Sequence, residues 1–198
     1  MHVTFLAHDG FFIELHSVCL LFDWWKEPVP PLPDKPLLVF VSHKHEDHFN
    51  PEVFTLAERK QDVQFLLGSD FHLTPRSLEK WRLSPETAAK CRRCGKHDTL
   101  EPLPGVTVET FPSTDEGVAW MVTAEDRSIF HAGDLNWWHW PEEDAAWNRN
   151  MAANFKRYTE PLRGRRADLA MLPLDPRLGK DGYLGPQYFL ELMDIRHF

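Results

Sequence analysis

The stretch Phe40-Val41-Ser42-His43-Lys44-His45-Glu46-Asp47-His48-Phe49 decides the fold, because three histidines and two carboxylates fall within six positions directly after an apolar run. Residues 37–41 are predicted to be a buried strand, since they are apolar, partly β-branched and preceded by Pro36. Sites in α/β sheets lie where strands end. Neutral imidazole and carboxylate are the ligands that zinc and similar divalent metals prefer. The alternative is a solvated loop that is merely rich in histidine. The pattern His-x-His-x-Asp-His behind a strand favours the metal site.

This pattern resembles the signature of the metallo-β-lactamase fold superfamily, and two further motifs extend the resemblance over nearly all of residues 1–198. The segment 130–134, Phe-His-Ala-Gly-Asp, is similar to the later family motif, a strand that ends in Gly-Asp. The segment 113–117, Ser-Thr-Asp-Glu-Gly, falls where the family usually places a third histidine ligand before a glycine. The resemblance is to a little-characterised bacterial branch. It implies an α/β fold, an αββα four-layer sandwich of two mixed sheets, and metal chemistry, but it does not identify a substrate.

The resemblance also implies a site for two divalent metal ions, zinc above all, with manganese or iron as alternatives. In the family's scheme His43 and His45 bind the first ion, while Asp47 and His48 bind the second. Asp134 bridges both ions, and a bridging carboxylate suits metals about 3.5–4 Å apart.

Two departures from the family pattern concern the remaining ligands. No histidine occupies the third-ligand position, so Asp115 is expected to supply an oxygen donor there, or else to cap the turn before Gly117. In the family, a final strand carries a last metal-binding histidine, and His197 comes too early for that role. We therefore expect one domain, residues 1–198, that lacks its natural C-terminal end and one ligand of the second metal.

A further set of residues is predicted to line the substrate pocket: His8, Trp137, Trp138, Asp175 and Arg177. The tryptophans follow the bridging aspartate, and they either pack under loops or form an apolar wall beside the metals. Arg177 either binds a substrate carboxylate or phosphate through its planar fork, or pairs with Asp175. His8 lies in the first turn, which in related sheets approaches the site.

Composition narrows the class of protein. An apolar content of 42% is enough for one sizeable core, and a net charge of −8 argues against a nucleic-acid partner. No apolar run approaches the roughly 20 residues that cross a membrane, and no secretory signal is visible. Three cysteines suit a reducing cytoplasm, and Cys91 and Cys94 are interpreted as loop thiols rather than half of a zinc site. The oligomeric state is not predicted.

Patterns of apolar residues and turn chemistry predict the secondary structure. Strands are expected over 3–7, 11–15, 18–22, 37–41, 63–67, 106–111, 118–123, 128–131 and 167–172. Helices are expected after Asn50, at Thr74-Pro75, from Pro141 onward and over 186–193. The first three strands should form an antiparallel meander, whereas the segment 84–100 shows no clear periodicity.

The leading hypothesis for function is a metal-dependent hydrolase. Two divalent ions lower the pKa of a shared water, so that hydroxide attacks a small ester, lactone or phosphoester. Asp47 would orient the nucleophile and pass a proton to the leaving group, and Asp134 would hold the two ions together. One alternative is a metal-binding or interaction domain of the same fold with little catalysis, indicated by the missing third histidine. Another is an iron-dependent redox member of the superfamily.

Overall fold

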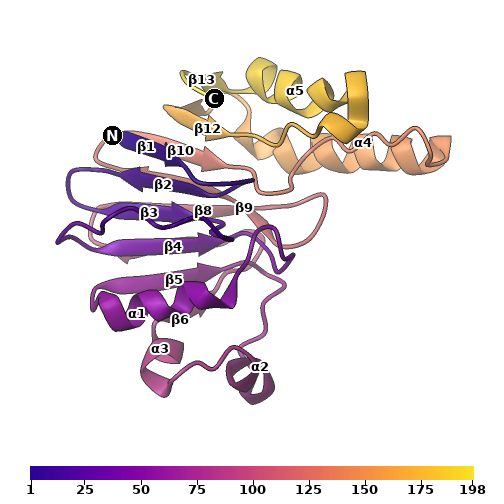
Figure 1. Cartoon of the computed structure of the whole chain (residues 1–198). Helices are drawn as coiled ribbons and strands as arrows, with labels where there is room; N and C mark the ends of the chain where they lie inside the picture. Colours follow the sequence, from indigo (N-terminus) through magenta and orange to yellow (C-terminus); the bar gives the residue numbers. More distant parts are fainter. The chain divides into compact units, whose positions relative to one another are not determined.

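The computed structural model describes residues 1–198, and its contacts divide the chain into two compact units, Met1–Gly95 and Lys96–Phe198. Each unit is built on its own mixed β-sheet with helices packed on it, as can be followed along the chain in Figure 1. The prediction of an α/β fold with two mixed sheets is therefore confirmed. The prediction of one domain stays a prediction. None of the helices combines the length and the apolar character needed to span a membrane.

The first unit holds a six-stranded sheet in the order β1-β2-β3-β4-β5-β6. Its strands are β1 (His2–Phe5), β2 (Phe11–Glu14), β3 (Cys19–Phe22), β4 (Leu37–Val41), β5 (Val63–Leu67) and β6 (Cys91–Arg93). The first three strands form the predicted antiparallel meander, and β3 to β6 run parallel. The parallel strands β4 and β5 are almost entirely buried, as continuous apolar runs require.

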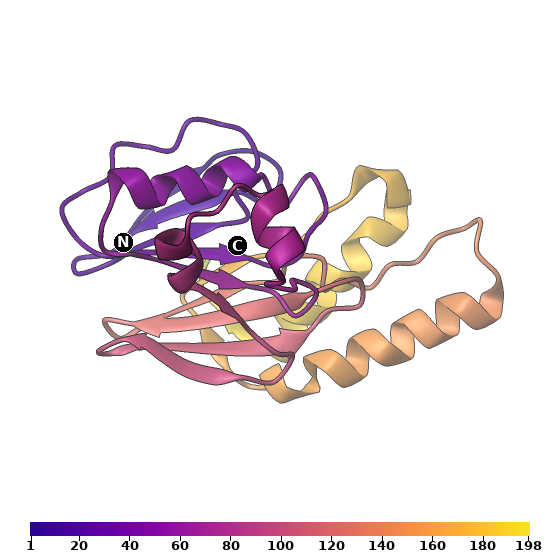
Figure 2. The same cartoon turned by 90° about the horizontal axis from the view of Figure 1, so that it is seen from below.

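Short helices cover this sheet: η1 (Pro51–Thr55), α1 (Leu56–Arg59), α2 (Pro75–Lys80) and α3 (Pro85–Ala89). Asn50 begins the first of them as predicted, because its side-chain oxygen accepts a hydrogen bond of 3.0 Å from the Glu52 N–H. Figure 2 shows the η1–α1 segment lying across one face of the sheet. Its apolar residues Val53, Phe54 and Leu56 join Val39 and Phe65 in the core of this unit.

The second unit holds a five-stranded sheet in the order β12-β10-β9-β8-β7, beside a two-stranded sheet of β11 and β13. Its strands are β7 (Thr99–Leu103), β8 (Val106–Pro112), β9 (Val118–Ala124), β10 (Arg127–His131), β11 (Arg166–Ala167), β12 (Leu169–Met171) and β13 (Asp194–Ile195). Its helices are α4 (Ala145–Thr159), η2 (Glu160–Leu162), η3 (Pro176–Tyr183) and α5 (Leu184–Leu192). Phe130, Phe155 and Phe189 pack their rings together, which fastens α4 and α5 to β10.

The segment 84–100, whose sequence shows no clear periodicity, contains α3, β6 and the start of β7. The interpretation of both thiols of this segment as loop residues is wrong for Cys91. Cys91 begins β6 rather than lying in a loop, and Cys94 is buried just beyond it. Burial raises the pKa of the Cys91 thiol to about 12, so this sulfur stays protonated.

The predicted strand 167–172 is instead two strands, β11 and β12, separated by Asp168. The Asp168 side chain is only 2% exposed and accepts hydrogen bonds from the Ser128 N–H (3.0 Å), Arg166 (2.6 Å) and Arg196 (3.3 Å). Burial raises the pKa of this carboxyl, but these three donors outweigh burial and lower the pKa to about 2. Asp168 therefore links β10, β11 and the segment that follows β13.

Replacing Asp168 with Asn should lower the free energy of unfolding at pH 7 by about 1–2 kcal/mol, because a charged acceptor of three hydrogen bonds is lost. The pKa of about 2 in the folded protein lies below the ordinary value of 3.8. The stabilisation is therefore complete above about pH 4 and disappears as the pH falls towards 2. Urea unfolding of both proteins at pH 7 and pH 2.5 checks this. A difference in stability that is equally large at both pH values would contradict it.

Candidate metal centre

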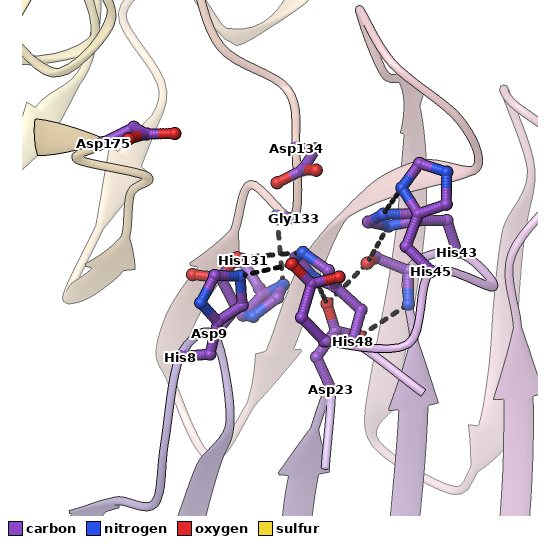
Figure 3. A network of polar contacts seen from close by, with 12 residues as sticks. His8, Asp9, Asp23, His43, His45, His48, His131, Gly133, Asp134 and Asp175 are labelled. Carbon is purple, nitrogen blue, oxygen red and sulfur yellow. Dashed lines mark hydrogen bonds and ion pairs between the residues drawn. The ribbon is translucent and has the colours of Figure 1, made fainter. Parts of the chain in front are cut away.

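The histidine motif forms a tight turn directly after β4. Backbone N–H groups of His48 and Phe49 both bond to the His45 carbonyl, at 3.0 and 2.9 Å. This turn brings the three imidazoles together: the His43 and His48 rings are 4.1 Å apart, and the His43 and His45 rings 4.6 Å (Figure 3). His43 and His48 are buried, whereas His45 is exposed. The turn thus presents three ring nitrogens from six residues.

A buried carboxylate, Asp23, fixes the orientation of the two inner histidines. Asp23 directly follows β3 and accepts hydrogen bonds from the Ser42 N–H (2.7 Å), the Ser42 hydroxyl and His48 Nδ1 (2.9 Å). Because the Ser42 hydroxyl gives its proton to Asp23, its oxygen accepts the bond from His43 Nδ1, 2.9 Å away. Both histidines therefore carry a proton on Nδ1, so Nε2 is the atom that each neutral imidazole offers to a metal.

These Nε2 atoms suit a divalent metal ion. Burial and the neighbouring His48 lower the pKa of His43 to about 3, so its imidazole is neutral, which is the form that binds metal. The first unit contains two groups of donor atoms. One consists of His8, Asp9 and His48, and the other of Asp23, His43 and His48. Within each group the donor atoms all lie within 4.8 Å of one another. The Asp9 carboxylate is 3.5 Å from His48 Nε2. A nitrogen and an oxygen donor side by side fit the ligand preferences of zinc, iron and manganese.

Asp47 lies at the rim of this group rather than within it. Its carboxylate is 3.2 Å from His8 Nε2, and both side chains are close to half exposed. The His8 ring also stands edge-on to His48, with 5.1 Å between their centroids. Asp47, predicted to be a metal ligand, is therefore in direct contact with His8, predicted to bind the substrate.

Asp134 follows β10 in the second unit and is half-buried. The backbone before it turns at Gly133, which has a φ of 50° and donates its N–H to His131 Nδ1 at 3.2 Å. The Asp134 carbonyl accepts a hydrogen bond from Trp138 Nε1 (3.0 Å), and it lies 3.3 Å from the Thr114 hydroxyl, whose single proton it shares with the Asn136 carbonyl. Hydrogen bonds to the backbone of Gly133 and Asp134 thus fix the turn from which the Asp134 carboxylate extends.

Asp115 lies on a neighbouring turn of the same unit and is exposed. The Thr114 hydroxyl joins the two turns, because it donates to the Asn136 carbonyl (2.7 Å) and accepts from the Asn136 N–H (3.0 Å). Carboxylate oxygens of Asp115 and Asp134 come within 4.8 Å of each other. The oxygen-donor role of Asp115 stays a prediction.

The predicted pocket residues of the second unit separate into two kinds. Trp137 packs against Phe155 and Tyr188, so it contributes to the core. Trp138 instead stacks on Trp140, with ring planes 5° apart.

The guanidinium of Arg177 lies 5.5 Å from the centre of the Trp140 ring and forms a two-pronged ion pair with Asp175. Asp175 also accepts a hydrogen bond of 2.8 Å from the Arg177 N–H. Pairing of Arg177 with Asp175, one of the two predicted alternatives, is therefore what the structure contains.

Sequence reasoning missed three residues of the first unit: Asp9, Asp23 and Ser42. A signal existed for Asp23, since it is a carboxylate directly after a fully buried strand. Its φ of 38° is also typical of Asp or Asn and uncommon for other side chains. Ser42 and Asp9 carry no comparable signal, because serine and aspartate are ordinary residues in turns.

Comparison with known proteins identifies the family and the fold. The sequence profile of the β-lactamase superfamily domain matches residues 20–173. A metallo hydrolase from the archaeon Ignicoccus hospitalis has a similar structure, with a TM-score of 0.55, 16% identity, and coverage of 99% of this chain and 94% of that one. The diiron β-hydroxylase CmlA from Streptomyces venezuelae gives a TM-score of 0.56 at 14% identity, covering 98% of this chain and 43% of CmlA. At such identities the likeness shows the fold alone.

One relative is similar in sequence. A protein of Mycolicibacterium smegmatis, named for a Rieske 2Fe-2S iron–sulfur centre, is 34% identical over 95 residues. The match covers 40% of this chain and 18% of that protein, so this chain corresponds to only a small part of its relative.

Proposed function

The chain belongs to the β-lactamase superfamily domain family, and from that premise we propose that it is a metal-dependent hydrolase of a small ester, lactone or phosphoester. The observation that carries the proposal is the pair of buried histidines, His43 and His48, whose Nε2 lone pairs are kept available by hydrogen bonds that end at Asp23. A histidine that only fills a core has no need of such an arrangement.

We assign the metal ligands as the sequence predicts them and add one. His43, His45 and Asp115 would hold the first ion, and Asp47 and His48 would hold the second. Asp134 would serve both ions, as the family's scheme implies, and the oxygen of Asp9 beside His48 Nε2 is the added candidate for the second ion. When bound, the metal ions supply Lewis acidity, which activates water and polarises the scissile carbonyl or phosphoryl oxygen.

The remaining chemistry falls to side chains of the chain itself. Asp47 is half exposed and contacts His8, so it can accept a proton and deliver it to a leaving group while His8 orients its carboxylate. The stacked indoles of Trp138 and Trp140 offer an apolar surface to a substrate, and Arg177, over the Trp140 ring and paired with Asp175, could exchange that partner for a substrate anion. A small molecule is the proposed partner, and the net charge of −8 disfavours nucleic acid.

The metal-loaded protein should slowly hydrolyse at least one member of a panel of esters, lactones and phosphodiesters. Chelation should abolish turnover, and added zinc or manganese should restore it. Asp47→Asn should lower kcat by about 100-fold or more, the usual contribution of a proton-transfer group. Glu46→Gln, the same change of charge at the exposed neighbouring position, should leave kcat unchanged. Equal kcat values for these two variants would overturn the role of Asp47, and no turnover of any substrate would overturn the hydrolase proposal.

A second candidate function is iron-dependent oxidation. Two comparisons favour it: the fold is shared with a diiron hydroxylase, and the sequence is related to a protein named for a Rieske centre. The carboxylate-rich donor set, with Asp9, Asp115 and Asp134, also suits iron. Consumption of oxygen by the iron-loaded protein in the presence of an electron donor, without hydrolysis of the panel, would select this candidate. If the protein binds metal but neither hydrolyses the panel nor consumes oxygen, the remaining alternative is a metal-binding domain with little catalysis.

A further inference from the structure

A cleft of about 230 Å³ lies beside helix α2, outside the donor groups described above. Its lining side chains are Lys44, His72, Arg76, Lys80 and Trp81, with the hydroxyls of Thr74 and Ser77 between them. Three of these residues are cationic and none is a carboxylate, although the chain as a whole has a net charge of −8. A local excess of positive charge on an acidic protein indicates attraction of an anion.

The position of the cleft connects it to the metal-binding turn. Strands β4 and β5 are parallel neighbours, so the histidine motif after β4 and the loop after β5 leave the same edge of the sheet. The Asp70 carboxylate ties the two loops, since it accepts a hydrogen bond of 2.9 Å from the Lys44 N–H. Lys44 itself stands between His43 and His45. Crevices outside the carboxyl ends of parallel strands are where such sheets bind ligands.

The cations of the cleft, rather than its hydroxyls, are suited to recognition. The Ser77 hydroxyl donates to the His72 carbonyl, and the Thr74 hydroxyl accepts from the Ser77 N–H at 3.2 Å, so both hold the loop in shape. The Lys44 side chain is 40% exposed, and its ammonium lies 3.9 Å from the Asp70 carboxylate, a separation that allows it to turn towards a ligand. Arg76 and Lys80 are exposed.

The wall of the cleft is rigid. Trp81 packs its ring against Phe49 and Phe71, with centroids 5.6 and 5.5 Å apart. A larger cavity of about 550 Å³ shares Lys80 and Trp81, but Glu52 and Glu58 line it as well, so the smaller cleft is the one whose lining is cationic without a carboxylate.

We propose that this cleft binds the carboxylate or phosphate group of an anionic substrate that is cleaved at the metal centre. The proposal rests on the proposed hydrolytic function and narrows its substrate class to anionic esters, lactones or phosphoesters. A guanidinium and two ammonium groups around a small cleft match either anion, because Arg76 can bind two oxygens at once while the lysines act as point charges.

Binding can be tested without turnover. Inorganic phosphate and acetate, titrated separately into the zinc-loaded full chain, should shift the amide resonances of residues 72–81 in nuclear magnetic resonance spectra. The double variant Arg76→Gln, Lys80→Gln should weaken this binding about 10-fold or more, and the stronger of the two probes identifies the anion. Arg59→Gln with Lys96→Gln removes the same charge at exposed positions elsewhere and is the control. Equal weakening in the two double variants, or shifts confined to residues 43–48, would overturn the proposal.

Kinetics separate this proposal from the proposed function. KM is measured for a neutral ester and for an anionic ester of the same alcohol, and the ratio of the anionic to the neutral KM is compared between variants. This ratio should be about 10-fold higher in the Arg76→Gln, Lys80→Gln variant than in the control double variant. Hydrolysis with an unchanged ratio would overturn the cleft and support the hydrolase. Anion binding that depends on Arg76 and Lys80, in a protein that hydrolyses neither ester, would support the cleft and overturn the hydrolase.

Discussion

Asp134→Ala is expected to remove most of the bound metal, with affinity falling by roughly 100-fold or more, since loss of residues that merely orient ligands already costs 10–100-fold. Asp134 is the proposed ligand of both ions, so its loss leaves two cations without the negative charge between them. Its backbone hydrogen bonds to Trp138 and Thr114 involve the carbonyl and remain in the variant, so the turn should keep its shape. Elemental analysis of the purified variant measures the loss.

The control for this variant is His97→Ala. His97 is exposed and belongs to no group of metal donors in the structure. Its replacement should leave metal content unchanged. A full complement of metal in the Asp134→Ala protein would contradict the bridging role, and loss of metal in the His97→Ala protein would point to a site elsewhere.

Asp23→Asn should lower metal affinity by about 10–100-fold while the protein still folds. The side-chain oxygen of the introduced asparagine would keep the bond from the Ser42 N–H, and its amide nitrogen would then face His48 Nδ1. An amide donor at that place requires His48 Nδ1 to accept, so the proton moves to Nε2 and blocks the atom that binds metal. Asparagine also tolerates the φ of 38° at this position.

Asp23→Ala is the companion variant and should destabilise the fold itself, by about 3–4 kcal/mol. It leaves the buried Ser42 N–H and His48 Nδ1 without their acceptor and puts alanine at a positive φ. Urea unfolding and metal titration of both variants check the pair. If Asp23→Asn bound metal as tightly as the unaltered protein, the argument from the histidine protonation would be wrong.

The sequence predicts much of the fold because its strongest signals are local. Residues 37–41 and 63–67 are strands with the predicted bounds, since buried parallel strands are continuous apolar runs between polar turns. The meander of β1 to β3 follows from short apolar segments separated by turn residues. The helix start at Asn50 follows from a cap residue and a proline in the first turn.

Other features depend on contacts between residues far apart in the chain, which local patterns do not contain. Asp168 divides an apolar segment into two strands because Ser128 and Arg196 supply donors from elsewhere. Likewise, three histidines in a short motif indicate a metal site, but the protonation of His48 is set by Asp23, 25 residues away. Trp137 and Trp138 are neighbours in an aromatic run, yet only the fold decides that one packs in the core and the other stacks on Trp140.

The central proposal is that the histidine motif holds metal, with Asp134 as a further ligand, and metal content tests it most directly. After expression in medium that contains zinc, iron and manganese, inductively coupled plasma mass spectrometry of the purified protein should find close to two transition-metal ions per chain. The His43→Ala, His48→Ala double variant, purified in the same way, should retain few of them. Absence of transition metal from the unaltered protein, or an undiminished content in the double variant, would contradict the account.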